Sequence, residues 1–114
     1  MSIRYAFQSG DLPELTLTGY ALAQAGFTAG TLFRIRLYRN GLMLTRLHED
    51  TDIAALMAEL DGSDTEGADW MEDSGTLTLA GDWLTLSGLL GQPLIIDVLP
   101  GNITIRAEQR NMLA

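Results

Sequence analysis

The chain has no cysteine and no lysine, and it has one histidine, His48. Without cysteine there is no disulfide framework and no thiolate nucleophile, and without lysine there is no P-loop and no Schiff base. A single histidine and no cysteine argue against a zinc site of the usual ligand types. No stretch approaches the roughly 18 apolar residues of a membrane span, and the N-terminal residues lack an apolar signal-peptide core. The sequence therefore predicts a cytoplasmic protein.

The charges are distributed unevenly along the chain. All seven basic residues are arginine, against 15 acidic residues, and the net charge is −8. Between Leu47 and Ile105 there are 12 acids and no basic residue. A field of this sign repels phosphate backbones and attracts basic surfaces. The distribution argues against nucleic acid as a partner and favours a basic protein.

One sequence pattern occurs twice, in residues 15–46 and again in residues 76–107. Leu15-Thr16-Leu17-Thr18-Gly19 aligns with Leu77-Thr78-Leu79-Ala80-Gly81, and after a one-residue gap four further apolar positions align: Ile35, Leu37, Leu42 and Leu44 with Ile96, Val98, Ile103 and Ile105. Each copy predicts a strand, a helix of at most two turns that ends at Gly26 or Gly88, and two more strands. In the first copy Asn40-Gly41 predicts the hairpin turn between these strands.

A unit of this length cannot bury enough apolar surface to fold alone. We therefore expect the two copies to pack across a pseudo-twofold axis into one domain, residues 1–114. Between them, residues 48–75 predict a helix that Thr51-Asp52 caps, with Gly62 as its stop and a solvated acidic connection over residues 61–74. Ahead of the first copy, Ile3, Tyr5 and Phe7 alternate, and whether they add an edge strand stays open.

The glycines and core positions of both copies resemble a known family. The shared positions are Gly19, Leu22, Ala25-Gly26-Phe27 and Gly30 in the first copy, and Gly81, Trp83-Leu84, Gly88 and Gly91 in the second. The pattern is similar to the SymE-type toxin domain, which is related to the AbrB/MazE swapped-hairpin fold of two interlocked chains. The resemblance implies a mostly β (α+β) fold, tandem-duplicated into a monomeric single-chain pseudo-dimer with one extra helix between the repeats. SymE-type proteins are regarded as toxins that act on RNA, and their AbrB-like relatives bind DNA. The resemblance therefore implies a toxin that acts on RNA.

The sequence supplies no catalytic, cofactor-binding or metal-binding residue of its own. His48 lies beside Glu49 and Asp50, and we interpret it as a solvated residue rather than a general base. Residues 61–72 do not match the calcium-binding loop of an EF-hand, because Glu66 occupies the position where that loop needs glycine. Enzymatic activity is left open; if the chain is an enzyme, the resemblance implies an endoribonuclease.

Two hypotheses about function follow. The charge distribution favours an antitoxin or immunity-type protein that neutralises a basic partner such as a nuclease toxin. Its expected contacts lie in the acidic connection and are Asp64, Glu66, Asp69, Trp70 and Glu72. Trp70 is the expected anchor of the partner, unless it only pins the connection to the core. The alternative is a SymE-type toxin that binds or cleaves RNA. Its expected contacts are Arg34, Arg36 and Tyr38, which alternate with apolar residues and share one strand face, unless that face is merely solvated.

Overall fold

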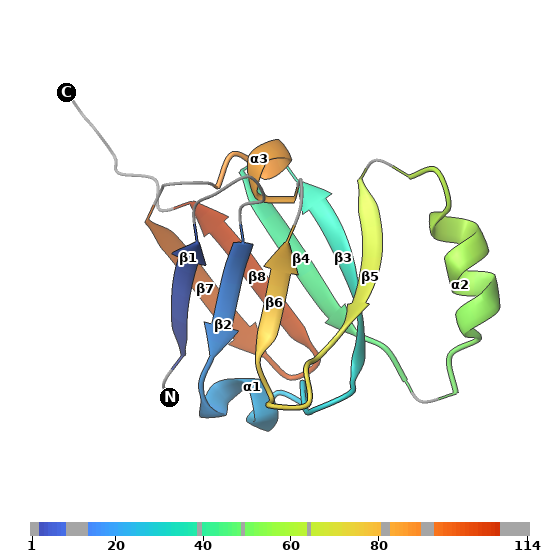
Figure 1. Ribbon diagram of the computed structural model, residues 1–114, viewed down its shortest axis with the longest axis horizontal. Helices are drawn as coiled ribbons and strands as arrows, with labels where there is room; N and C mark the ends of the chain where they lie inside the picture. The colour runs from blue at the N-terminus through green and yellow to red at the C-terminus, as the bar shows by residue number, and fades with distance from the viewer. Residues whose placement is uncertain are drawn as a thin grey trace.

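The computed structural model describes residues 3–8, 14–38, 40–48, 50–63, 65–80, 83–89 and 93–107. These residues form two antiparallel sheets packed face to face (Figure 1). The smaller sheet has the order β1 (Arg4–Gln8), β2 (Glu14–Thr18), β6 (Leu77–Ala80). The larger has the order β5 (Glu66–Trp70), β3 (Leu32–Tyr38), β4 (Gly41–Arg46), β8 (Asn102–Ala107), β7 (Leu94–Leu99). The predicted mostly β fold is confirmed at this level.

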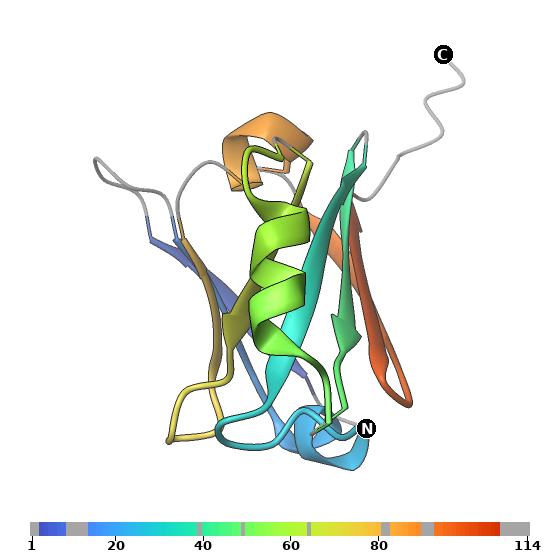
Figure 2. The ribbon, with the colours of Figure 1, turned by 90° about the vertical axis from the view of Figure 1, so that its right-hand side faces the viewer.

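Three short helices complete the described structure. Helix α1 (Tyr20–Gln24) closes one end of the space between the sheets, and α3 (Trp83–Ser87) closes the other (Figure 1). Helix α2 (Ile53–Leu60) stands to one side, next to β5 at the edge of the larger sheet (Figure 2). None of the helices in the described ranges has the length and apolar character that crossing a membrane requires.

The core lies between the two sheets and follows from the alternation of apolar residues. In β2, β3, β4, β6 and β8 every second side chain points inward, and these positions carry mainly leucine, isoleucine and phenylalanine. Twelve of the largest side chains are almost completely buried: Leu15, Leu17, Leu22, Phe27, Phe33, Ile35, Leu42, Leu44, Leu77, Leu79, Leu84 and Leu89. The rings of Phe27 and Phe33 meet with centroids 6.2 Å apart and tilted by 57°.

Two strand pairings connect residues 15–46 (the first half) with residues 76–107 (the second half). In the smaller sheet β2 pairs with β6, and Thr16 lies opposite Thr78. In the larger sheet β4 pairs with β8, and Met43 lies opposite Thr104. Each half therefore contributes strands to both sheets, and both halves contribute side chains to the same core.

The predicted helix ends are confirmed. Asp52 is the N-cap of α2, and its carboxylate accepts a hydrogen bond of 3.1 Å from the backbone N–H of Ala55. Gly26, Gly62 and Gly88 follow the three helices with φ of 94°, 78° and 76°, in the left-handed region that glycine adopts without a steric penalty. The alternation of Ile3, Tyr5 and Phe7 corresponds to an edge strand, β1, paired with β2.

Two local expectations were wrong. The acidic connection contains a strand, β5, because its backbone can pair with the free edge of β3, an interaction that no local sequence pattern reveals. The hairpin turn falls one residue earlier than Asn40-Gly41: Tyr38 pairs with Gly41, and Asn40 has the positive φ, 63°. Gly41 already belongs to β4, where a Cβ atom would lie 3.0 Å from the carbonyl oxygen of Ile105.

The shared core generates a stability prediction. Leu17 is fully buried on β2, while its neighbour Thr16 lies on the opposite, outer face of the same strand. Leu17→Ala should lower the free energy of unfolding by about 2–5 kcal/mol, because it leaves a cavity between the sheets. Thr16→Ala, the matched control, should cost less than about 1 kcal/mol. Urea unfolding measures both values, and equal losses would contradict the assignment of the two faces.

Candidate functional site

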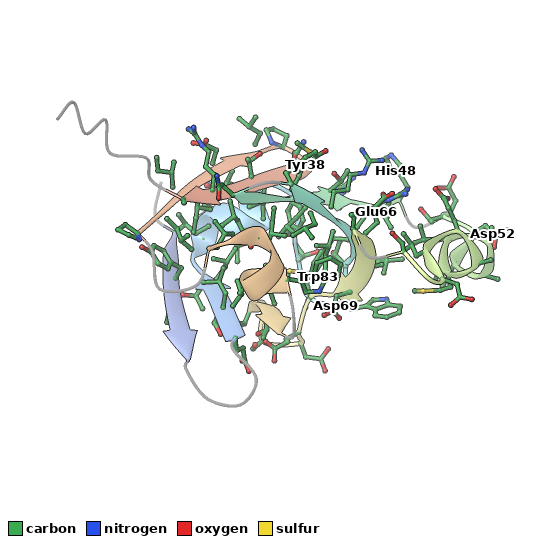
Figure 3. The ribbon with its side chains drawn as sticks, turned by 90° about the horizontal axis from the view of Figure 1, so that it is seen from above. Tyr38, His48, Asp52, Glu66, Asp69 and Trp83 are labelled. Atoms are coloured by element: carbon green, nitrogen blue, oxygen red, sulfur yellow. The ribbon has the colours of Figure 1, made fainter. Side chains whose placement is uncertain are left out.

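The outer face of the larger sheet carries the arginines and the tyrosine of β3. Arg34, Arg36 and Tyr38 alternate with Phe33, Ile35 and Leu37, so the polar set points away from the core. Figure 3 shows Tyr38 on the side of the larger sheet that faces away from the smaller one. The side chains of Tyr38 and Arg36 are both 48% exposed. The predicted common face of the three residues is present.

Two acids of the same chain contact these arginines. Glu66 lies on β5 directly opposite Arg36, and its Oε1 atom accepts a hydrogen bond of 2.9 Å from Nε of Arg34 and one of 3.2 Å from Nε of Arg36. Glu59, on α2, accepts a bond of 3.0 Å from Nη2 of Arg34. Arg34 thus connects β3, β5 and α2, and this contact holds the acidic segment against the sheet.

These contacts shift the ionisation of the residues that make them. The hydrogen bond from Arg34 is the largest effect that lowers the pKa of Glu66 below the ordinary glutamate value, with a smaller effect from Arg36 and a partly opposing effect of burial. The hydrogen bond to Glu59 is the main effect that raises the pKa of Arg34 further. Both residues are charged at neutral pH, so the cluster is an ion-pair network.

The described acids among those predicted to bind a partner, Glu66, Asp69 and Glu72, do not form one surface. Glu66 points to the outer side, occupied by Arg34 and Arg36, whereas Asp69 points to the inner side beside Trp83 (Figure 3). Oε2 of Glu72 accepts a hydrogen bond of 2.6 Å from the hydroxyl of Thr78, and Asp64 lies outside the described residues. Binding of a basic protein by these acids stays a prediction.

Trp70 and Met71 have opposite environments. Met71 is 2% exposed and belongs to the core, so it is the residue that pins the connection. Trp70 is 47% exposed and lies opposite Leu32 at the end of β5, on the same face as Glu66. The indole is therefore available at the surface, as expected of an anchor.

A groove with a volume of about 770 Å³ runs beside Trp70 at this end of the sheet. Its described walls come from three separate parts of the chain: Gly26 and residues 28–32 after α1, residues from the end of β4 to the start of α2 (46–48, 50–51 and 53), and Trp70 of β5. The polar side chains among them are Thr28, Thr31, Arg46, His48, Asp50 and Thr51. A second hollow of about 420 Å³ shares Gly26, Arg46 and His48 with this groove.

Arg46 differs from the paired arginines of the larger sheet. Arg34, Arg36 and Arg106 each contact an acid, whereas Arg46 makes no ion pair with any described residue. Its guanidinium lies against Gly26, where an added Cβ atom would come within 2.5 Å of a terminal nitrogen. Arg46 is exposed, and none of the described side chains pairs with its guanidinium, which can therefore donate to a ligand.

Sequence reasoning missed this groove. It interpreted His48 as solvated, and His48 is indeed exposed, but it did not single out Arg46. No local signal marks the site, because its residues are adjacent only after β3 pairs with both β4 and β5. In the described ranges, no three of the usual metal-binding side chains gather as a metal site would require.

The ion-pair network generates a prediction of pH dependence. Because the pKa of Glu66 is lowered in the folded state, its stabilising effect is present above the ordinary value of 4.5 and is lost as the pH falls through the folded pKa. Acid should therefore destabilise the wild type more steeply than Glu66→Gln, which has no such charge to lose. Arg34→Gln removes the main cause of the lowered pKa of Glu66 and should also make the stability less dependent on pH. Thermal unfolding between pH 7 and about pH 3 measures this difference, and parallel profiles would contradict it.

Comparison with known proteins gives one family. The family model described as toxin SymE, type I toxin–antitoxin system, matches residues 51–107, which is half of the chain. The match covers α2, β5 and the second half, and the first half lies outside it. No curated protein and no solved structure matches the chain.

The match overturns the expectation of an antitoxin or immunity-type protein, because the matching family consists of toxins. That expectation treated the acids as a surface for a basic partner, but Glu66 neutralises arginines of its own chain. The resemblance to SymE that the glycine and core pattern indicated is confirmed. The chain belongs to the SymE toxin family of type I toxin–antitoxin systems.

Proposed function

We propose that the protein is a SymE-type toxin that acts in the cytoplasm by binding RNA on the outer face of its larger sheet. The observation that carries the proposal is the outward-facing row of Arg34, Arg36 and Tyr38 on β3, in which Arg36 and Tyr38 are exposed and Arg34 is 17% exposed beneath its acidic partners. Cations next to an exposed aromatic ring are the combination that single-stranded nucleic acid needs, because phosphates bind the cations and bases stack on the ring. Membership of a toxin family supports the same function.

The geometry of this row of side chains suits a single strand of RNA. From Leu32 to Tyr38 the strand extends over roughly 20 Å, and its outward side chains follow one another at intervals of about 7 Å. Arg36 uses Nε toward Glu66, so among the described residues its terminal amino groups have no partner and remain for phosphate oxygens. Tyr38 lies at the end of the row, where an unpaired base can stack on it.

Glu66 limits the affinity of this face. It contacts both arginines, so an RNA phosphate must compete with it or share their remaining donors. Glu59 contributes to the same competition at Arg34. We therefore expect moderate, salt-sensitive binding, with the strength set by the acids on β5 and α2 as much as by the arginines.

Charge substitutions test the function directly. Glu66→Gln should tighten binding of a fluorescein-labelled oligoadenylate RNA several-fold, because it releases Arg34 and Arg36. The matched control, Glu14→Gln, removes the same charge from the other sheet and should have little effect. Arg34→Gln with Arg36→Gln should weaken binding and reduce the slope of log K against log salt by roughly 0.7 for each lost phosphate contact.

Fluorescence anisotropy at several salt concentrations measures all of these variants. Two results would contradict the proposal: equal affinities for Glu66→Gln and Glu14→Gln, or undiminished RNA binding by the double arginine variant. Circular dichroism of each variant establishes that the fold is retained.

We further propose that the chain arose by tandem duplication and folds as a single-chain pseudo-dimer of AbrB/SymE type. In β2–β6, Thr16 lies opposite its repeat equivalent Thr78, and Leu15 and Leu17 lie opposite Leu79 and Leu77 in exchanged order. In β4–β8, Met43 likewise lies opposite its equivalent Thr104. A twofold axis between equivalent halves requires this kind of register, which supports the proposal.

The two proposals together predict one RNA-binding face and a monomer. The second half has Ile95 and Asp97 at the positions of Arg34 and Arg36, so it cannot form a second basic row. Because each half already completes the sheets of the other, the chain should be monomeric at micromolar concentration. Light scattering measures the mass in solution, and a stable dimer that exchanges strands would contradict the pseudo-dimer.

A further inference from the structure

The groove beside Trp70 has the size of a small-ligand site. Its volume of about 770 Å³ falls in the range of roughly 300–1,000 Å³ that is typical of pockets for small molecules. It is open at the surface of the molecule, and no part of the functional proposal above uses it. Its walls combine apolar, cationic and hydroxyl groups, which together indicate the kind of ligand that fits.

Trp70 and Ile53 are the most exposed large apolar side chains of the groove, which Ala29, Leu32 and Leu47 also line. The two side chains are 47% and 46% exposed, and both line the same space. An exposed indole offers a flat surface on which any nucleic-acid base can stack, and stacking of this kind does not depend on sequence. Ile53 adds a second apolar surface, as in sites that hold a base between aromatic and aliphatic side chains.

The polar part suits a phosphate. Arg46 has no acidic partner among the described residues, and a guanidinium presents several donors to phosphate oxygens. Thr28 and Thr31 line the groove with their hydroxyls 3.1 Å apart. Among the described lining residues Asp50 is the one acid and Arg46 the one arginine, whereas the whole chain has 15 acids against seven arginines. The described walls of the groove therefore do not show the acidic excess of the chain as a whole.

One wall of the groove, Trp70, lies at the end of the face that carries the basic row of the larger sheet. Trp70 pairs with Leu32, which is the next outward position of β3 after Arg34. A single strand of RNA that follows Tyr38, Arg36 and Arg34 along β3 reaches the indole of Trp70 at the end of the sheet. The next nucleotide then lies within the groove, with Arg46 and His48 among its walls.

From these observations we infer that the groove is a nucleotide-binding subsite for one unstacked base of single-stranded RNA. The base stacks on Trp70, and Arg46 binds the adjoining phosphate. The inference rests on the RNA-binding function proposed above and adds to it the class of RNA, because a base inside a duplex cannot enter the groove.

Substitutions in the full chain test the subsite with two probes, a short labelled oligoadenylate and an RNA duplex of matching length. Trp70→Ala should weaken binding of the single strand about ten-fold or more and change duplex binding much less. Trp70→Phe should retain most of the affinity, because the ring can still stack. Arg46→Gln should weaken binding of the single strand as well and reduce its salt dependence.

Matched controls separate the subsite from general effects of charge and aromatic area. Tyr20→Ala removes an aromatic ring that is 73% exposed and lies outside the groove. Arg106→Gln makes the same charge change as Arg46→Gln, but Arg106 pairs with Gly41, at the opposite end of β4 from Arg46. Both controls should bind the single strand nearly as the wild type does.

Tryptophan fluorescence gives a reading that a structural role of Trp70 would not produce. Stacking on Trp70 should quench the emission of the wild type when oligoadenylate is added. The Trp70→Phe variant retains Trp83, which packs against Gly67. The tryptophan emission of this variant should not change when oligoadenylate is added. Thermal unfolding of each variant establishes that the fold is intact.

The outcomes distinguish the two proposals. If the wild type binds the single strand but Trp70→Ala and Arg46→Gln bind it as well as their controls, the groove is not the subsite, and the RNA-binding function stands. If the wild type binds neither RNA, the function itself is wrong and the subsite with it. Preferential loss of single-strand binding in both groove variants, with quenching only where Trp70 is present, supports the inference.

Discussion

Pairing of strands between the two halves of the chain is the constraint on which the rest of the structure depends. Each half has strands whose apolar faces need a second sheet, and a unit of about 32 residues cannot supply one by itself. The pairings β2–β6 and β4–β8 provide the missing partners and enclose the leucine-rich core. The same pairings place β3 near one edge of the larger sheet, with its outer face toward solvent. The position of Arg34 and Arg36 is thus a consequence of how the core is completed.

The sequence predicted the parts of the fold that depend on local pattern. Alternation located the strands and their buried faces, and the left-handed glycines and the Asp52 cap located the helix ends. Strand β5 escaped prediction because Glu66-Gly67-Ala68-Asp69-Trp70 has neither alternation nor strand-forming composition; it is a strand because it pairs with β3. The common face of Arg34, Arg36 and Tyr38 was predictable from alternation alone. The groove was not, because Arg46, Ile53 and Trp70 become neighbours only through pairings between distant segments.

The error about function came from using net charge in place of local charge. A net charge of −8 repels RNA only where its field reaches, and at physiological ionic strength the screening length is about 8 Å. Two of the acids that the sequence suggested as a partner surface have partners inside the chain: Glu66 with Arg34 and Arg36, and Glu72 with Thr78. What a phosphate meets at the outer face is therefore a set of partly neutralised arginines. The acidic residues elsewhere on the protein would mainly slow its first encounter with RNA, while the contacts at the outer face would decide the affinity for RNA.

Glu66 links stability and proposed function in opposite directions. Its contacts with Arg34 and Arg36 help to hold β5 on the edge of β3, and β5 positions Trp70 at the groove. The same contacts occupy the donors that an RNA phosphate would use. A carboxylate that bound the arginines more strongly would fix β5 more firmly but weaken the basic row, and a neutral residue would do the reverse. Arg46 has no such competitor among the described residues, because it contacts none of their acids. Binding at Arg46 therefore requires none of the described ion pairs to be broken, so the first stable RNA contact is expected there, with the row on β3 engaged afterwards.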